Sequence, residues 1–390
     1  MREPIYLDNS ATTPMCEEAL AVFIEVSRSH YGNPSSLHAL GHDAERIIEG
    51  ARERILSSLY AKDGDIIFTS SGTEANNLAI FGRAYAKERF RRKAKVITAL
   101  GEHASVSAPF DALEKEGYRV AKIPTLGGVI DMEALRRELT REVCLVSFML
   151  VNNETGAVYN IPEAARLVKE LSPDAYIHVD ATQGYMKIPF SPSGLLADAV
   201  TVSAHKIAGP KGVGALYISE RVKKEKGLSA VTLGGGQEGG LRSGTENVAG
   251  IAAFAAAAER AFASLKPNIR KMEGLRNKLI DVLGCDARFS EISVTRPPMH
   301  APHILNITLP DIKSETMLHF LSSEGIFVSS GSACSSNSRH HSSALVAYGR
   351  SEGEADTSIR ISFSPSNTEE EIDTLVSVLA EGLKRLARIK

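Results

Sequence analysis

The sequence predicts an α/β protein whose main element is a largely parallel β-sheet with helices on both faces. From about residue 40 to 255, short apolar runs alternate with segments of helical pattern. Runs that are apolar or β-branched at most positions are typical of parallel strands, because helices bury both faces of such a sheet. A chain of 390 residues is also longer than a domain with a single hydrophobic core usually is, so we expect a second domain.

The predicted strands of the first domain are short, and turn or polar residues flank each of them. A helical stretch, such as residues 163–171, lies between most neighbouring strands. The strands are predicted at Asp65–Phe68, Lys95–Thr98, Cys144–Phe148, Tyr176–Val179, Ala199–Val202 and Gly214–Tyr217.

An alanine-rich stretch at residues 248–283 predicts one long helix or two joined helices, with a break or kink at Pro267. We take it as the connection to the second domain, and we expect a large domain of residues 15–255 and a small domain of residues 1–14 and 256–390. The small domain has an α+β pattern. Strands are predicted at 304–308, 326–328 and 359–363, with helices at 314–324 and from 367 to the C-terminus.

Composition narrows the classes of function. The net charge of −2 offers no electrostatic case for binding nucleic acid or an anionic membrane, and the basic residues at 89–95 are best explained as a solvated helix end. No apolar run reaches the roughly 18 residues that span a bilayer, and the N-terminus lacks a signal-peptide pattern. The scattered cysteines show neither disulfide nor metal spacing, so we expect a cytoplasmic protein; they are Cys16, Cys144, Cys285 and Cys334.

Polar segments follow several predicted strands, at the sheet edge where open α/β sheets bind ligands. The first is residues 70–77, where Gly72 and Thr73 open a helix whose free N–H groups suit a phosphate. The spacing of Ser71 and Glu74 also fits an ordinary capping box. Taken alone, this segment leaves both interpretations open.

Asp180 and a lysine end two further strands. Asp180 is either a helix or turn cap, or the partner of a buried cation such as a protonated pyridine nitrogen. Lys206 closes Ser203-Ala204-His205-Lys206, and burial there would lower the pKa of its amine and make it nucleophilic. We favour Lys206 over Lys211, because glycine and proline around Lys211 are typical of a turn.

Three other segments can serve a ligand or a purely structural role. His103 is either a structural histidine or an aromatic ring that stacks on a ligand. Asn153 could donate its amide to a ring oxygen. The glycine-rich loop at 234–245, with Arg242 and Thr245, suits a phosphate but is also typical of many mobile loops.

A loop of small residues at 329–336 contains Cys334, which is either an incidental cysteine or a thiol that must move. Arg360 lies in a predicted apolar strand and therefore needs an anionic partner, for which a substrate carboxylate has the right bidentate geometry.

Taken together and in order, these segments resemble the cysteine desulfurases, a class-V aminotransferase group of fold-type-I enzymes that use pyridoxal 5′-phosphate (PLP). The resemblance covers nearly the whole chain. The motifs that carry it are residues 6–13, 72–77, 102–103, 153–156, 178–183, 203–206, 242–245 and the loop around Cys334.

The resemblance implies a role for each matching residue. Lys206 would hold PLP through a Schiff base and move the substrate's α-proton, and Cys334, on a mobile loop at about 329–342, would take the sulfur of L-cysteine as a persulfide. His103 would stack on the ring and exchange protons near the sulfur, and Arg360 and Asn153 would bind substrate. The remaining cofactor contacts would come from Gly72, Thr73, Asn153, Asp180, Gln183, Ser203, His205 and, from the neighbouring subunit, Thr245.

The resemblance also implies a mostly parallel seven-stranded sheet in the large domain, a homodimer and no metal. It further implies a protein that accepts the sulfur, for iron–sulfur cluster assembly or for thiolation of a cofactor or tRNA. A selenocysteine lyase and another class-V enzyme are alternatives. Residues 337–343 depart from the family, which has an acidic residue and a proline there, and the chain lacks the longer tail of the members that feed iron–sulfur scaffolds.

Overall fold

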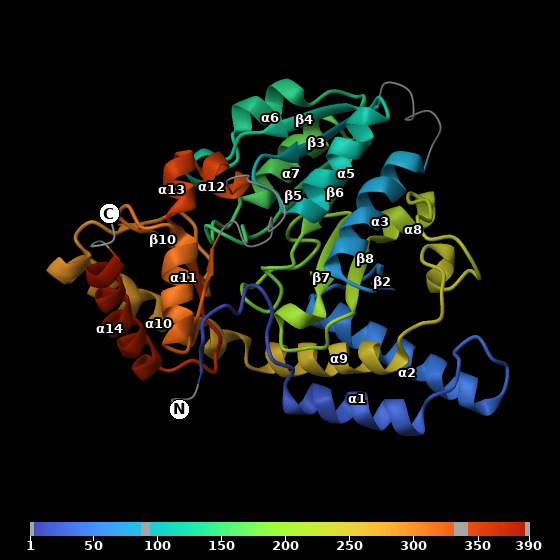
Figure 1. Ribbon diagram of the computed structural model, residues 1–390. Coiled ribbons are helices and arrows are strands. Elements are labelled where there is room, and N and C mark those ends of the chain that lie inside the picture. The colour runs from blue at the N-terminus through green and yellow to red at the C-terminus, as the bar shows by residue number, and fades with distance from the viewer. Residues whose placement is uncertain (1–3, 87–93, 331–341, 387–390) are drawn as a thin grey trace.

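The computed structural model describes residues 4–86, 94–330 and 342–386. Its largest element is a seven-stranded sheet in the order β2-β8-β7-β6-β5-β3-β4. Strand β8 pairs antiparallel with both of its neighbours, whereas the other pairings are parallel. The predicted α/β fold with a largely parallel sheet is therefore confirmed (Figure 1).

The predicted strands of this sheet all form, and one further strand was not predicted. Strand β4 (Arg119–Ile123) is at the sheet edge and mixes basic with apolar residues, so it lacks the continuous apolar run of a central strand. The other strands are β2 (Asp65–Thr69), β3 (Lys95–Ala99), β5 (Val143–Met149), β6 (Tyr176–Asp180), β7 (Ala199–Ser203) and β8 (Gly214–Ile218).

Both faces of the sheet are buried, which explains why its strands are apolar at nearly every position. In β2, Ile67 packs into one hydrophobic cluster, while Ile66 and Phe68 point to the other. The Ile67 side is covered by α3 (Gly72–Tyr85), α5 (Ala104–Lys115) and α8 (Glu220–Glu225). The opposite side is covered by α1 (Glu17–Ser29), α2 (Ala39–Ser58), α6 (Met132–Glu138), α7 (Ile161–Leu171) and α9 (Val248–Ala263).

Helix α9 meets α10 (Leu265–Cys285) at a bend of 74°. The break is at Ser264, so the prediction of a break at Pro267 was wrong. Pro267 instead lies in the first turn of α10, where its missing N–H costs no helical hydrogen bond. Within the described residues no single helix has the length and apolarity to cross a membrane, and only the bent α9–α10 pair passes that test on length and composition.

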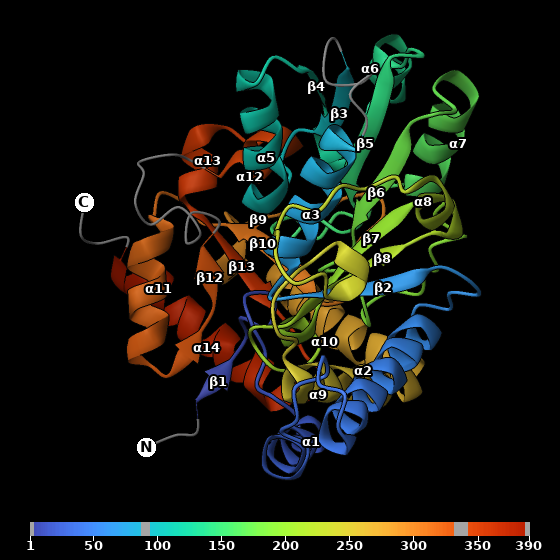
Figure 2. The same cartoon turned by 90° about the vertical axis from the view of Figure 1, so that its right-hand side faces the viewer.

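The C-terminal part forms a second layer around a four-stranded antiparallel sheet in the order β12-β13-β10-β9 (Figure 2). Helices α10, α11 and α14 pack with this sheet in a separate hydrophobic cluster. The strands are β9 (Ser293–Val294), β10 (Ile304–Thr308), β12 (Ser329–Ser330) and β13 (Ser358–Ser362), and the helices that follow α10 are α11 (Ser314–Ser323), α12 (Ser343–Tyr348), α13 (Glu352–Asp356) and α14 (Glu369–Leu386).

The N-terminal segment packs with this C-terminal part. Strand β1 (Ile5–Tyr6) pairs in parallel with β11 (Ile326–Phe327), and Leu7 belongs to the same hydrophobic cluster as α14. From there the chain returns to the large sheet, where Thr13 donates its hydroxyl to the carbonyl of His205. The domain boundaries given above stay a prediction.

Candidate active site

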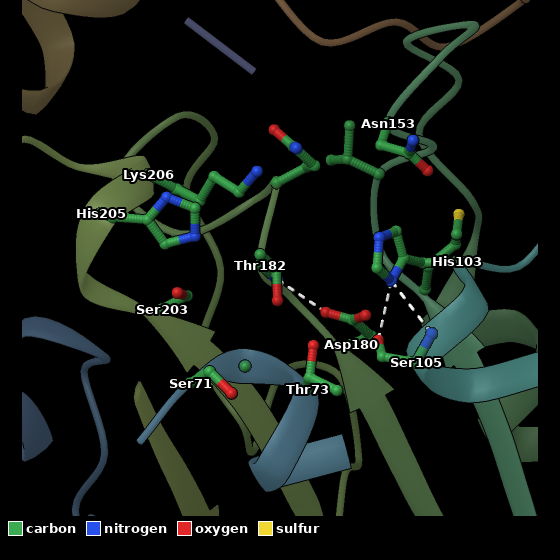
Figure 3. A pocket seen from close by; sticks show the side chains of 14 residues that line it. Ser71, Thr73, His103, Ser105, Asn153, Asp180, Thr182, Ser203, His205 and Lys206 are labelled. Carbon is green, nitrogen blue, oxygen red and sulfur yellow. Dashed lines mark hydrogen bonds between the residues drawn. The ribbon is translucent and has the colours of Figure 1, made fainter. Parts of the chain in front are cut away.

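A cavity of about 220 Å³ opens at the carboxyl ends of β5, β6 and β7, next to the first turn of α3. In Figure 3, Lys206 and His205 lie on one side of it and His103 and Asn153 on the other. The cavity brings together most of the residues predicted to bind a cofactor: Gly72, Thr73, His103, Asn153, Asp180, Gln183, Ser203, His205 and Lys206.

Asp180 is the last residue of β6, and its side chain is held from two directions. Asn76 Nδ2 donates to its Oδ2 at 2.8 Å, and the backbone N–H of Thr182 donates to its Oδ1 at 2.9 Å. Asp180 is buried, with only 6% of its surface exposed. A buried carboxylate held in this way is suited to pair with a cation on a ligand.

Lys206 reaches the same cavity from a single 3₁₀ turn, Ala204–Lys206, directly after β7. Its ammonium donates to the carbonyl oxygens of Ser10 at 2.6 Å and Ala11 at 2.8 Å. Lys211 is exposed and does not line the cavity. Of the two lysines weighed from the sequence, the fold therefore directs Lys206 toward the site.

His103 is the N-cap residue of α5, and its ring lies across the cavity from Lys206 (Figure 3). Its Nδ1 is 2.8 Å from Ser105 Oγ, and Asn76 Nδ2 donates to that same hydroxyl at 2.8 Å. Burial lowers the pKa of the His103 imidazole, although the negative charge of Asp180 opposes the shift. The ring is therefore neutral at physiological pH and can give or accept a proton.

The floor of the cavity is built to accept an anion. Gly72 and Thr73 begin α3, where N–H groups point away from the helix, and Ser203 Oγ is buried with no hydrogen-bond partner among the described residues. A Cβ at Gly72 would lie only 3.2 Å from Thr182 Oγ1. His205 lies on the Lys206 side of the cavity, next to this floor. Burial, aided by the charge of Lys206, lowers the pKa of His205 to about 4, so its neutral ring can donate to an anion.

These side chains fit PLP group by group. The phosphate matches the first turn of α3 with the unpaired Ser203 hydroxyl, the ring nitrogen matches the held carboxylate of Asp180, and the aldehyde matches an amine such as that of Lys206. The flat ring matches the imidazole of His103.

Arg360 and Thr245 do not line this cavity, and Cys334 lies outside the described residues. The anionic partner that Arg360 needs is supplied by Asp8, whose Oδ1 is 2.9 Å from Arg360 Nη2. Arg360 Nη1 donates to the carbonyl of Asn153 at 2.8 Å, which places the guanidinium beside the mouth of the cavity. Thr245 is exposed on the loop before α9.

In the glycine-rich loop at 234–245, the guanidinium of Arg242 pairs with a carboxylate of the protein itself. Arg242 Nε lies 2.9 Å from Glu74 Oε1, at the start of α3. Glu74 Oε2 also accepts the backbone N–H of Ser70 at 2.6 Å. Ser71 caps α3 by accepting the N–H of Glu74 at 3.2 Å. The capping interpretation of this segment is therefore correct, and the same turn still lines the cavity.

Sequence reasoning missed several residues that hold the site together. Asn76 bridges Ser105 and Asp180, and Ser10 accepts from both Lys206 and Gln183 through its carbonyl. Asn76 had a detectable signal, because it is a polar residue on the buried face of a helix that starts at the site. Ser10 had no such signal, since only its backbone takes part.

Two glutamates beside the site have raised pKa values. Glu102 is fully buried, burial raises its pKa well above the usual value, and it accepts the N–H of Met149 at 2.8 Å. Burial also raises the pKa of Glu154 to about 7, and the hydroxyl of Ser342 donates to this carboxyl group. Glu154 therefore connects the rim of the site to the residue that caps α12.

Comparison with known proteins gives one consistent answer. The class-V aminotransferase family model matches residues 5–375. A cysteine desulfurase IscS of Clostridium botulinum (strain Hall) is 37% identical over 389 residues, which cover 99% of this chain and 96% of the relative. Two solved structures are also similar over most of both chains.

The first is a NifS-like protein with a TM-score of 0.89 and 36% identity, covering 98% of this chain and 99% of its own. The second is described as SspA in complex with cysteine, with a TM-score of 0.80 and 30% identity, covering 93% of this chain and 100% of its own. The match extends through both the large sheet and the C-terminal layer. The chain belongs to the class-V aminotransferase family, in the group of the cysteine desulfurases.

Proposed function

We propose that this protein is a PLP-dependent cysteine desulfurase that converts L-cysteine to L-alanine and retains the sulfur as a persulfide on Cys334. The observation that carries the proposal is the convergence of Lys206, Asp180 and His103 around a cavity with an anion-binding floor. The family relationship supports it, since the named relative is a cysteine desulfurase and a similar solved structure is described as a complex with cysteine.

When bound, PLP supplies an electron sink for charge that develops at the substrate's α-carbon. Asp180 would keep the ring nitrogen protonated, and Asn76 and the Thr182 N–H hold its carboxylate in place. Lys206 would anchor the cofactor and then, as a free amine, remove the α-proton. The carbonyls of Ser10 and Ala11 orient this amine at the cavity edge.

The sulfur step would use Cys334 as a thiolate. Its Sγ attacks the substrate sulfur, so that an S–S bond forms as the substrate's Cβ–S bond breaks. The electron pair of the broken bond stays with the carbon skeleton, which takes up a proton and leaves as alanine. His103 is neutral and faces the cavity, so it can hand over a proton near the sulfur.

Arg360 would bind the substrate carboxylate at the cavity mouth. In the structure its two terminal nitrogens contact Asp8 Oδ1 and the carbonyl of Asn153. An incoming carboxylate would therefore have to share the guanidinium with Asp8 or displace it. Asn153 both lines the cavity and accepts a hydrogen bond from Arg360 through its carbonyl.

We further propose a homodimer in which Thr245 reaches the phosphate of the neighbouring subunit. Its exposed position, outside the cavity of its own chain, is compatible with such a contact. We also propose a cytoplasmic enzyme that passes sulfur to an acceptor protein, for iron–sulfur cluster assembly or for thiolation of a cofactor or tRNA. Cys16, Cys144 and Cys285 are free thiols, as a reducing compartment would keep them.

The decisive experiment measures alanine and sulfide released from cysteine, in the presence of a thiol reductant, by the wild type and by Cys334→Ser. We expect the wild type to produce both and the variant to lose nearly all activity while it keeps its bound cofactor. A variant as active as the wild type would overturn the persulfide step. A selenocysteine lyase would cleave selenocysteine but not cysteine, and another class-V enzyme would act on neither.

A further inference from the structure

A second cavity, of about 420 Å³, lies on the other side of the turn that carries Lys206. It is bounded by the N-terminal segment, by Ile207 and Ala208, and by the loop before α14, so segments from both the large-sheet part and the C-terminal part of the chain form its walls. The proposed sulfur chemistry makes no use of this cavity.

The inner wall of this cavity contains a buried lysine, Lys187, which is only 7% exposed. Among the described residues, its ammonium has neither a hydrogen bond nor an ion pair. A buried amine without a partner is costly, because it gives up its hydration for nothing in return. Accordingly, burial lowers the pKa of Lys187 to about 8.

The rest of the lining also favours an anion. Arg260 is at the rim, where Glu18 neutralises it at 3.1 Å, and no carboxylate is among the residues that line the cavity in the described chain. Two lining residues, Met186 and Ala208, have left-handed backbones with φ of 57° and 64°. Non-glycine residues rarely adopt this conformation, and those that do concentrate at ligand sites.

We propose that this cavity is a binding site for a small organic carboxylic acid, whose carboxylate pairs with the ammonium of Lys187. An organic acid suits the site better than phosphate does. Among the described lining residues, Lys187 is the one cation that no carboxylate pairs with, and Met15, Met186 and Ile207 add apolar surface, whereas phosphate is usually held by several N–H donors.

The cavity adjoins the turn that carries Lys206, so a ligand bound there can affect the candidate active site. Thr13 lines the cavity, donates its hydroxyl to the carbonyl of His205 at 2.8 Å and accepts the N–H of Ala208 at 2.8 Å. Lys206 lies between these two contacts. An acid bound at Lys187 would therefore touch the same turn that sets the position of Lys206.

The first test is the thermal unfolding of the holoenzyme at pH 7 with increasing butyrate, with sodium chloride at matched ionic strength as the reference. We expect the melting temperature to rise to a plateau in the wild type and to stay unchanged by butyrate in Lys187→Met. Lys62→Met, which removes an exposed lysine that does not line the cavity, should respond like the wild type. An equal response in Lys187→Met, or a response to phosphate that matches butyrate, would refute the site as proposed.

A second measurement needs no variant. Acylation of individual lysines is followed by peptide mass spectrometry at pH 8, with and without butyrate. At a butyrate concentration ten times the dissociation constant, the acylation rate of Lys187 should fall about tenfold, while that of Lys62 stays constant. An unchanged rate at Lys187 would count against binding there, whether or not the enzyme turns over cysteine.

Discussion

At the scale of single residues, the candidate site combines a carboxylate held by hydrogen bonds with two histidines that burial keeps neutral. Asp180 is held by two donors, whereas His103 and His205 have lowered pKa values and are neutral at physiological pH. A negative group, neutral imidazoles and an amine thus share one small cavity. This division of charge suits a ligand that carries both a cationic ring and an anionic phosphate.

Replacing Lys206 by alanine should abolish the visible absorbance of the Schiff base with PLP and reduce the release of alanine from cysteine to background. Lys211→Ala is the matched control, because Lys211 is five residues away but is exposed and outside the cavity. Absorbance spectra of the two purified variants, after incubation with PLP and gel filtration, show which lysine forms the Schiff base. If Lys211→Ala lost the absorbance instead, the assignment of the anchoring lysine would be wrong.

The buried amine of Lys187 should make the free energy of unfolding depend on pH. Its pKa is about 8 in the folded protein and about 10.5 when unfolded, so between these values the unfolded chain binds more protons. The free energy of unfolding therefore gains a contribution as pH rises from 8 to 10.5. His303, which the charge of Lys187 also affects, is neutral throughout this range because its own pKa is well below 6.5.

Lys187→Met should remove this contribution. We expect the variant to be more stable than the wild type below pH 8, and the difference to shrink by up to about 3 kcal/mol by pH 10.5. Urea unfolding at a series of pH values measures it. A difference that does not change with pH would show that Lys187 is not desolvated in the folded protein.

At the scale of elements, helix ends bring the functional groups to the site. Helix α3 presents its first turn to the anion-binding floor, and His103 caps α5. Ser342 caps α12 through the N–H of Leu345 while its hydroxyl donates to Glu154. The start of α12 is thereby tied to the segment that holds Asn153.

The Glu154 carboxyl group should make this contact sensitive to pH. Its pKa is about 7 in the folded protein and about 4.5 when unfolded, so the folded state binds more protons between these values. The free energy of unfolding therefore loses a contribution as pH rises from 4.5 to 7. Glu154→Gln keeps a hydrogen-bond acceptor for Ser342 but cannot ionise.

We expect Glu154→Gln to match the wild type in stability near pH 4.5 and to exceed it near pH 8, as measured by chemical unfolding at both values. Glu114→Gln, at an exposed position in α5, serves as the control and should follow the wild type at both pH values. A Glu154→Gln variant that is less stable than the wild type at pH 8 would contradict the raised pKa.

At the scale of the whole molecule, the chain crosses more than once between the seven-stranded sheet and the C-terminal layer. The N-terminal segment starts in the C-terminal layer at β1 and ends at the turn that carries Lys206. Arg360, from β13 in that layer, reaches the carbonyl of Asn153 beside the cavity. The site is therefore assembled from both layers, and a change in their packing would alter it.

The proposed dimer can be tested by mixing inactive subunits. Lys206→Ala removes the amine of a subunit's own site, and Thr245→Asp would place a negative charge beside the phosphate in the partner's site. If Thr245 acts across the interface, refolding an equal mixture should restore about one quarter of wild-type activity, because half of the dimers are mixed and each of these has one intact site. If the refolded mixture is no more active than the separate variants, Thr245 does not act in the site of the neighbouring subunit.

The α/β class was predictable because strands buried on both faces are apolar at nearly every position, as in β5 and β6. Strand β4 was not, because it lies at the sheet edge and two of its five residues, Arg119 and Lys122, are basic. The break at Ser264 was also missed, since Pro267 is tolerated in the first turn of a helix. Local pattern therefore identified the strands that are buried on both faces, but it missed an edge strand and misplaced a helix break.

For the site, the sequence alone determined which side chains had the right chemistry, because Asp180, Lys206 and the turn at Gly72 each follow a strand whose end is predictable. Only the tertiary structure decided between Lys206 and Lys211, and only it showed that Asp8 pairs with Arg360 and that Lys187 is buried with no hydrogen-bond or ion-pair partner among the described residues. The physical reason is that burial, pairing and pKa depend on segments distant in the chain. Asp8 and Arg360 are 352 residues apart, and no local pattern records their contact.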